Sequence, residues 1–278
     1  MSIRTLLEPV RAGRTILGFT GCPDAGKTVS RVLAEMEASL PCEPAAVWDL
    51  EDYWCTETAR PEVLVHHGQI RRLDWPSYRF SLGWTPSSGP ILMGIGPEPS
   101  MRWRAFVREL FALLAQWECR EMILLGSFHD QVFHDETVFS GVVQDAESFN
   151  RIRGLGCERG EYEGTTAIHS AIMEASAEAG IRCASIWSHY PFYLNSLHEL
   201  LVARFLDMLG ALLGFQFDTT RLLASWHKKE KEIEELIQND RELHGLLEGM
   251  RKAEPVSGPA PRARNVLRLD EFLRKRKE

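Results

Sequence analysis

Residues 15–33, TILGFTGCPDAGKTVSRVL, place a short apolar run, a glycine-rich loop and the first turns of a helix in direct succession. The run Thr15–Phe19 is typical of a buried strand, because it is short, apolar and followed by loop residues. After the loop, apolar side chains recur at helical spacing on one face of residues 29–40. This strand, loop and helix therefore indicate the start of an α/β layer, in which helices cover a largely parallel sheet.

The same alternation continues along the chain. Strands are predicted at four further short apolar runs: 45–50, 91–95, 122–125 and 183–187. Helices are predicted at three amphipathic stretches, namely 103–117, 168–179 and 196–213. Ser196 and Glu199 form a capping box at the start of the last of these, and residues 63–74 read as a hairpin that adds one antiparallel element. We therefore predict a three-layer α/β/α sandwich around a mixed, mostly parallel sheet, with additional C-terminal helices.

Composition limits the possible functions. The chain has 278 residues, of which 44% are hydrophobic and 26% are charged, as in a folded protein with a sizeable core. Its net charge of −7 provides no basic field for nucleic acid, and no apolar stretch is long enough to span a membrane. The six cysteines form no Cys-x-x-Cys pair, which favours reduced thiols in the cytoplasm over a zinc site or disulfide framework.

The chain divides into three parts. Residues 1–217 are predicted to form the α/β core domain. Residues 218–252 form a C-terminal helical extension, read as one last helix. Residues 253–278 are a proline-rich linker and a basic tail, because three prolines precede a segment with seven basic and three acidic residues.

The loop after the first strand also matches the phosphate-binding pattern G-x-x-x-x-G-K-[ST] in full. A nucleotide site of this kind would use four residues: Gly21, Gly26, Lys27 and Thr28. The lysine would pair with the terminal phosphates and the threonine would bind magnesium. Two neighbours oppose this interpretation, because Asp24 places a carboxylate where an anion should bind and Pro23 lacks an amide donor. Nucleotide binding is therefore the alternative, not the leading interpretation.

Three blocks of sequence, in order along the chain, resemble one protein family. The first block is Asp24-Ala25-Gly26, and the second is Gly96-Pro97-Glu98-Pro99 leading into Arg102-Trp103-Arg104. The third is Tyr162-Glu163-Gly164-Thr165-Thr166, followed by a predicted helix and Ala179-Gly180-Ile181. Together they are similar to the signature of the proteasome assembly chaperone two (PAC-two) family over about residues 15–250. The chain departs from the family pattern at Thr165, where proline is common, and at residues 133–136.

The resemblance implies an architecture similar to that of purine nucleoside phosphorylases and hydrolases, without phosphorylase chemistry. It implies a non-enzymatic homo-oligomer, with a trimer favoured, acting as an assembly chaperone or protein-binding module. Proteasome-type subunits are the partners that it suggests. It implies no catalytic residue, no metal ion and no cofactor. It places the binding residues in the three blocks: Asp24, Ala25, Gly26, Glu98, Arg102, Trp103, Glu163 and Gly164.

A third interpretation is an enzyme with a small-molecule pocket at the carboxyl ends of the strands, where α/β sheets place their ligands. Asp24, Glu98 and Arg102 would line that pocket, beside the helix that starts near Thr165. The two carboxylates could equally cap helices, and Arg102 could neutralise Glu98. Both roles stay open. The histidines and carboxylates of residues 129–136 could hold a metal, but we favour a polar loop.

Tryptophan provides one further indication. Trp54, Trp75 and Trp84 fall in or beside predicted loops, where tryptophan is favoured as an anchor of protein interfaces. The sequence therefore predicts self-association or a protein partner.

Overall fold

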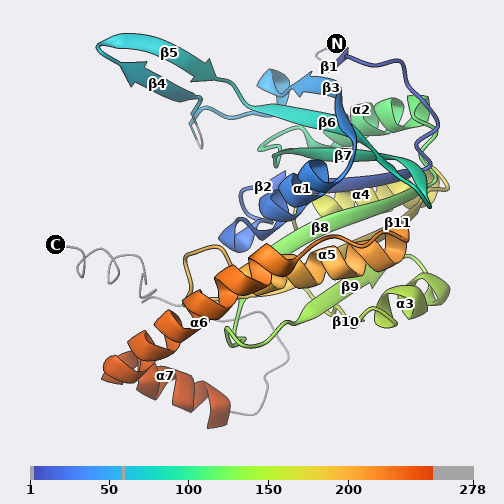
Figure 1. The fold of residues 1–278 in the computed structure, drawn as a ribbon. Helices are drawn as coiled ribbons and strands as arrows, with labels where there is room; N and C mark the ends of the chain where they lie inside the picture. The colour runs from blue at the N-terminus through green and yellow to red at the C-terminus, as the bar shows by residue number, and fades with distance from the viewer. Residues whose placement is uncertain (1–2, 58–59, 253–278) are drawn as a thin grey trace.

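The computed structural model describes residues 3–57 and 60–252. Its strands are β1 (Ile3–Thr5), β2 (Arg14–Thr20), β3 (Cys42–Asp49), β4 (Glu62–His66), β5 (Gln69–Asp74), β6 (Ser77–Thr85), β7 (Gly89–Pro97), β8 (Glu121–Asp130), β9 (Phe139–Val143), β10 (Cys157–Arg159) and β11 (Arg182–Pro191). Nine of these strands form one sheet in the order β1-β3-β6-β7-β2-β8-β11-β9-β10, and β4 and β5 form a second sheet by themselves (Figure 1). The strand of the opening motif, β2, therefore lies at the centre of the main sheet.

Helices cover both faces of the main sheet (Figure 1). They are α1 (Thr28–Ser39), α2 (Trp103–Gln116), α3 (Ala146–Arg153), α4 (Ile168–Glu178), α5 (Glu199–Leu213), α6 (Thr220–Asn239) and α7 (Arg241–Lys252), with short 3₁₀ turns η1 (Ala25–Lys27) and η2 (Glu51–Tyr53). Helices α1 and α5 pack together in one layer, and α2 and α4 pack together in the other. The predicted three-layer α/β/α sandwich is confirmed.

Two hydrophobic cores explain why the central strands are apolar throughout. Neighbouring residues of β2 point to opposite faces, so that Ile16 packs in the core under α1 and α5 while Leu17 packs in the core under α2 and α4. Ile123 and Leu124 divide β8 in the same way. Because each of these strands is covered on both sides, no polar alternation marks it in the sequence.

The main sheet is mixed, as predicted, but antiparallel pairing is as common as parallel pairing. Four of the eight strand pairs in the described residues are parallel and four are antiparallel. Strand β6, which the sequence analysis did not assign, accounts for two of the antiparallel pairs. The hairpin β4–β5 forms at the predicted residues, but it projects as a separate sheet and adds nothing to the main one (Figure 1).

The start of α5 differs from the prediction. The cap is His198, whose Nδ1 accepts the amide hydrogen of Leu201 at 3.3 Å. The Ser196 carbonyl instead accepts the hydroxyl of Tyr190, and the Glu199 carboxylate pairs with Lys229 at 2.7 Å. The predicted capping box is therefore wrong, because α5 begins only at Glu199 with His198 as its N-cap and the Glu199 side chain pairs with Lys229.

The last predicted helix is two helices. Asp240 has φ −109° and ψ 106°, an extended conformation that ends α6 and allows α7 to turn away. Helix α6 packs on α5 through three buried side chains, Leu222, Trp226 and Ile233. The division into core, extension and tail stays a prediction, and the linker and basic tail lie outside the described residues.

Ion pairs connect the amino ends of β2 and β8 to each other and to α3. The Arg14 Nε on β2 lies 2.8 Å from the Glu121 Oε2 on β8, and Arg151 of α3 pairs with the other Glu121 oxygen. The two guanidinium groups outweigh the effect of burial and hold the pKa of the Glu121 carboxyl below its usual value. Within the part of the chain that the structure describes, no helix combines the length and apolar character needed to cross a membrane.

Candidate functional site

The first two sequence blocks come together at the carboxyl ends of the central strands. Strands β2 and β7 are parallel neighbours in register, with Thr20 opposite Pro97. The loops that follow these strands therefore leave the sheet side by side, and the amide of Glu98 donates to the carbonyl of Thr20 at 3.1 Å. This is the place at which the sequence predicted a binding site.

The Asp24 carboxylate is turned back onto the start of α1. Its Oδ1 accepts the amide hydrogens of Val29 at 2.7 Å and Ser30 at 3.3 Å, and its Oδ2 accepts the Ser30 hydroxyl. These are free amides of the first helical turn, the groups that hold a phosphate in a phosphate-binding loop. A carboxylate of the chain itself occupies the anion position here.

Thr28 and Gly26 of the loop also make local contacts within the protein. Thr28 is fully buried, and its hydroxyl donates to the Ala25 carbonyl at 2.9 Å. Gly26 has φ +62°, and a Cβ on this glycine would lie 2.0 Å from the Tyr190 ring. Lys27 is exposed, in a left-handed conformation with φ 56°. The requirement for glycine at position 26 therefore has a packing and conformational cause that does not involve phosphate.

Glu98 has a similar role on the other face of the sheet. Its Oε1 accepts the amide hydrogen of Ile168, the first residue of α4, at 2.7 Å. The third sequence block, which ends where α4 begins, is thereby joined to the second. Both carboxylates of the predicted pocket cap helices, which is one of the two roles that the sequence left open.

Partial burial governs the electrostatics of this edge. Desolvation raises the pKa of the Asp24 carboxyl, and its bonds with Ser30 and Val29 offset only part of that effect. Desolvation likewise raises the pKa of the Glu98 carboxyl, against the bond from Ile168. Burial raises the pKa of the Cys22 thiol, and the nearby Glu98 charge adds to the shift. Cys22 is therefore not an activated thiolate.

The arginine and tryptophan of the second block contact residues other than Asp24 and Glu98. Arg102 Nη1 lies 3.5 Å from Asp52 Oδ1 and its guanidinium stands 5.6 Å from the centre of the Tyr53 ring, so Asp52, not Glu98, is its ion-pair partner. The Trp103 Nε1 donates to the Pro99 carbonyl at 2.6 Å and closes the turn before α2. Glu163 and Gly164 are exposed. Among the proposed binding residues, Asp24, Glu98 and Arg102 thus each have a partner of their own in the described structure.

The histidines and carboxylates of residues 129–136 have separate hydrogen-bond partners. Asp130 pairs with His189, and the Nδ1 of His134 is within 2.8 Å of the Tyr193 hydroxyl. Within residues 3–57 and 60–252, no three side chains of the His, Cys, Asp and Glu types converge as a metal site would require.

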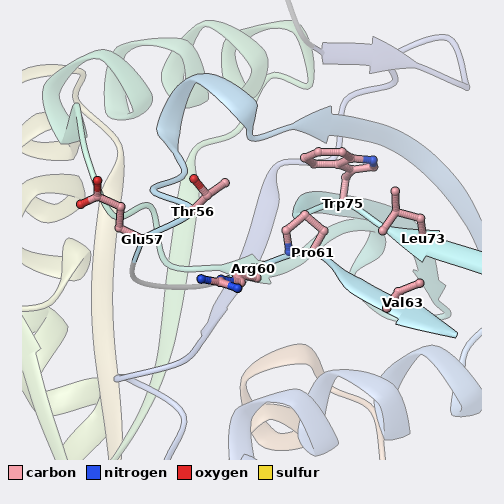
Figure 2. Close-up of a pocket in the computed structure, with 7 residues that line it drawn as sticks. All are labelled: Thr56, Glu57, Arg60, Pro61, Val63, Leu73 and Trp75. Carbon is pink, nitrogen blue, oxygen red and sulfur yellow. The ribbon is translucent and has the colours of Figure 1, made fainter.

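An open pocket of about 530 Å³ lies at the base of the β4–β5 hairpin. Figure 2 shows its lining: Thr56, Glu57, Arg60, Pro61, Val63, Leu73 and Trp75. Of these residues, only Trp75 was predicted from the sequence as an interface residue. The signal that could have found Val63 and Leu73 is the concentration of apolar residues in a short hairpin with too few strands to bury them.

These observations define the class of the protein. It is a three-layer α/β/α sandwich in which the chain's own carboxylates cap the helices that follow the central strands. The chain belongs to the PAC2 family, whose model matches residues 18–237. The family resemblance read from the three blocks is confirmed.

Solved structures agree with this assignment. A proteasome-assembly chaperone homologue of Mycobacterium tuberculosis is 29% identical, with a TM-score of 0.75 over 84% of this chain and 98% of that one. A PAC2 family protein of Streptomyces avermitilis is 26% identical, with a TM-score of 0.70 over 80% and 95% of the two chains. The archaeal proteasome activator PbaB of Pyrococcus furiosus shares the fold at 12% identity, with a TM-score of 0.67 over 84% and 97%. No curated protein matches the chain.

Proposed function

We propose that this protein is a homo-oligomeric protein-binding module with an assembly-chaperone role, and that the β4–β5 hairpin is its principal contact surface. Family membership supports the role, since similar structures include a proteasome-assembly chaperone homologue and a proteasome activator. Proteasome-type subunits are accordingly the partners that we propose. A trimer is the oligomer favoured by the family resemblance. Such a role needs no chemistry from the chain and no cofactor.

The hairpin carries the proposal because it exposes apolar side chains on an isolated two-stranded sheet. The exposed fraction of these side chains runs from 47% for Leu73 to 69% for Ile70. The others are Val63, Leu64, Val65 and Trp75. A two-stranded sheet is marginally stable alone, and contiguous exposed apolar surface of this kind marks an interaction site.

The apolar side chains are arranged in opposed pairs. Val65 lies directly opposite Ile70, and Val63 lies opposite Leu73. The second pair continues into the open pocket beside Trp75, as Figure 2 shows. A half-exposed tryptophan at the rim of an apolar hollow is a typical anchor point of a protein interface.

A second copy of this chain is the occupant that we propose for the hairpin. Among the described residues, β4 and β5 pair only with each other, so their outer edges have backbone groups available for a further strand. Figure 1 shows the hairpin extending well clear of the main sheet. A projecting arm can reach a neighbouring subunit without moving the core, and exchange of equivalent arms gives a closed symmetric ring.

The test is the mass of the assembly in solution, measured by light scattering and sedimentation velocity at tens of micromolar. We expect an oligomer for the unmodified chain and a monomer for Val65→Lys with Ile70→Lys, because two cations would be placed on the contact face. Leu6→Lys with Val10→Lys is the matched control, since both residues are 42% exposed and lie outside the hairpin. A monomeric unmodified protein, or a hairpin variant of unchanged mass, refutes the proposal.

Nucleotide binding by the loop at residues 21–28 is the alternative, and the Asp24 contacts disfavour it. Calorimetric titration of the unmodified chain and of Lys27→Ala with Mg·ATP and Mg·GTP checks this. We expect no heat of binding for either protein. Micromolar binding that Lys27→Ala abolishes would make the loop functional.

A further inference from the structure

Three polar side chains from three neighbouring strands form a continuous chain of hydrogen bonds. The His189 Nδ1 on β11 lies 2.7 Å from the Asp130 Oδ2 at the end of β8. Its Nε2 lies 2.9 Å from the Ser140 Oγ on β9. The His189 and Asp130 side chains are 15% and 25% exposed, and Ser140 is half-buried, so a small molecule in solvent can reach the group.

Strand pairing explains how these residues meet. Strand β11 lies between β8 and β9, with Pro191 opposite Asp130 and Trp187 opposite Ser140. His189 stands midway between those two positions and is therefore diagonal to both partners. Residues two apart in a strand share a face, so all three side chains rise from one side of the sheet.

The chemistry of the groups fixes the direction of the hydrogen bonds. An ionised carboxylate can only accept, so the His189 Nδ1 carries the proton and donates to Asp130. The Nε2 of the neutral ring is then an acceptor, and Ser140 donates its hydroxyl hydrogen to it. Burial raises the pKa of the Asp130 carboxyl, but the bonds from His189 and the Gln131 amide outweigh it and hold that pKa below its usual value.

We propose that Ser140 is an activated nucleophile that takes acyl groups from small esters, with His189 as its general base and Asp130 as a positioning residue. The order along the chain, Asp, Ser and His, carries no weight, because such a triad is recognised by geometry. Hydrogen-bonded serine, imidazole and carboxylate at 2.9 and 2.7 Å are the arrangement that acyl transfer requires.

The reaction balances with water as the only co-reactant. The Ser140 Oγ forms a bond to the ester carbonyl carbon while its proton moves to the His189 Nε2. The carbon–oxygen bond to the leaving alcohol breaks, and that alcohol takes the proton from His189. Water then attacks the acyl-serine, His189 accepts its proton and returns it to the Ser140 oxygen, and the carboxylic acid is released.

The surroundings indicate the class of ester. The Phe128 ring lies 4.5 Å from the His189 ring and 6.0 Å from the Trp187 ring, centre to centre. Phe128 and Trp187 are only partly buried and meet edge to face at 63°, so they offer aromatic contact area beside the nucleophile. An aromatic ring packs favourably against such side chains in offset or edge-to-face geometry. We therefore infer that aryl esters of short acids are the preferred acyl donors.

A second serine–histidine pair in the same protein provides an internal comparison. The His169 Nδ1 lies 2.9 Å from the Ser185 Oγ, but His169 is 98% buried. Its Nε2 has no hydrogen-bond partner among the described residues, so no carboxylate orients the ring. Ser185 should therefore not react with an ester in solution.

The probe is 4-nitrophenyl acetate, followed by release of nitrophenolate and by peptide mapping of the acetylated protein. We expect acetylation of Ser140, none in Ser140→Ala, and a rate lowered about 100-fold or more in His189→Gln through loss of the general base. Ser185→Ala is the matched control and should react as the unmodified chain does. Asp130→Asn should slow the reaction while leaving Ser140 in place, because the ring then loses its orienting acceptor.

Peptide mapping of the unmodified chain shows whether Ser140 is acetylated, even if a variant does not fold. Acetylation confined to lysines, or Ser140 acetylation equally fast in His189→Gln, overturns the proposal. The hairpin variant Val65→Lys with Ile70→Lys should retain full reactivity at Ser140. The esterase site and the proposed oligomer can therefore fail independently.

Discussion

Removal of the Asp24 cap should be costly, because one of the amides that it accepts is fully buried. In Asp24→Ala, the buried Val29 amide loses its acceptor at 2.7 Å and has no water to replace it. An unsatisfied buried donor costs about 1–3 kcal/mol. The two Ser30 donors are half-buried and can turn partly to solvent, so their loss adds about 1 kcal/mol. We expect a total destabilisation of roughly 2–4 kcal/mol.

The measurement is urea-induced unfolding of Asp24→Ala, Asp24→Asn and Asp145→Ala against the unmodified chain. Asp24→Asn keeps one acceptor oxygen for the Val29 and Ser30 amides but loses the favourable charge at the helix start, which is about 0.3–1 kcal/mol. Its NH2 group replaces the oxygen that accepts the Ser30 hydroxyl, so that hydroxyl must accept instead of donate. Asp145→Ala is the matched control, because Asp145 caps α3 through Ser148 at 2.7 Å but is exposed. It should cost about 1 kcal/mol. Equal losses for Asp24→Ala and Asp145→Ala would refute the argument that burial makes the Asp24 cap costly.

Three further changes test other parts of the site and the fold. Glu98→Ala should cost about 1–2 kcal/mol in urea unfolding, through the amide that it leaves unpaired at the start of α4. Glu121→Gln should cost about 1–3 kcal/mol near pH 7. Because the pKa of Glu121 is lowered in the folded state, the ionised carboxylate stabilises the fold at pH values above 4.5, and this stabilisation is lost as the pH falls through the folded-state pKa. The unfolding free energies of Glu121→Gln and the unmodified chain should therefore converge at that lower pH. Gly26→Ala should lower the melting temperature more than Gly13→Ala, since both have positive φ but only the former meets the Tyr190 ring.

Much of the fold follows from local patterns in the sequence. The run at 15–19 and the stripe at 29–40 predicted β2 and α1, because each carries its own period and its own boundary residues. The missed strand β6 carried a signal too, since Tyr78, Phe80 and Leu82 alternate with smaller or charged residues and are buried. Because β6 was missed, the predicted sheet lacked its two antiparallel pairs and was expected to be mostly parallel. Strand direction depends on which neighbours pair, and no local period encodes it.

The site shows where local reasoning fails. The carboxylates Asp24 and Glu98 were placed correctly at the strand ends, but their acceptor role depends on where α1 and α4 begin in space. Ser140 and His189 are 49 residues apart in sequence and meet only because β9 pairs antiparallel with β11. An aspartate, a serine and a histidine in this order have no spacing that marks them. Such a group becomes visible only when the register of the sheet is known.

The central position of β2 has a consequence for synthesis on the ribosome. Both of its partners are distant in sequence, because β7 begins about 70 residues and β8 about 100 residues after β2 ends. At about 5–20 residues per second, β2 waits roughly 3–14 seconds for β7 and roughly 5–20 seconds for β8 to be translated. Both edges of β2 therefore lack their partner strands for seconds during translation, and unpaired edges of this kind can pair with other chains.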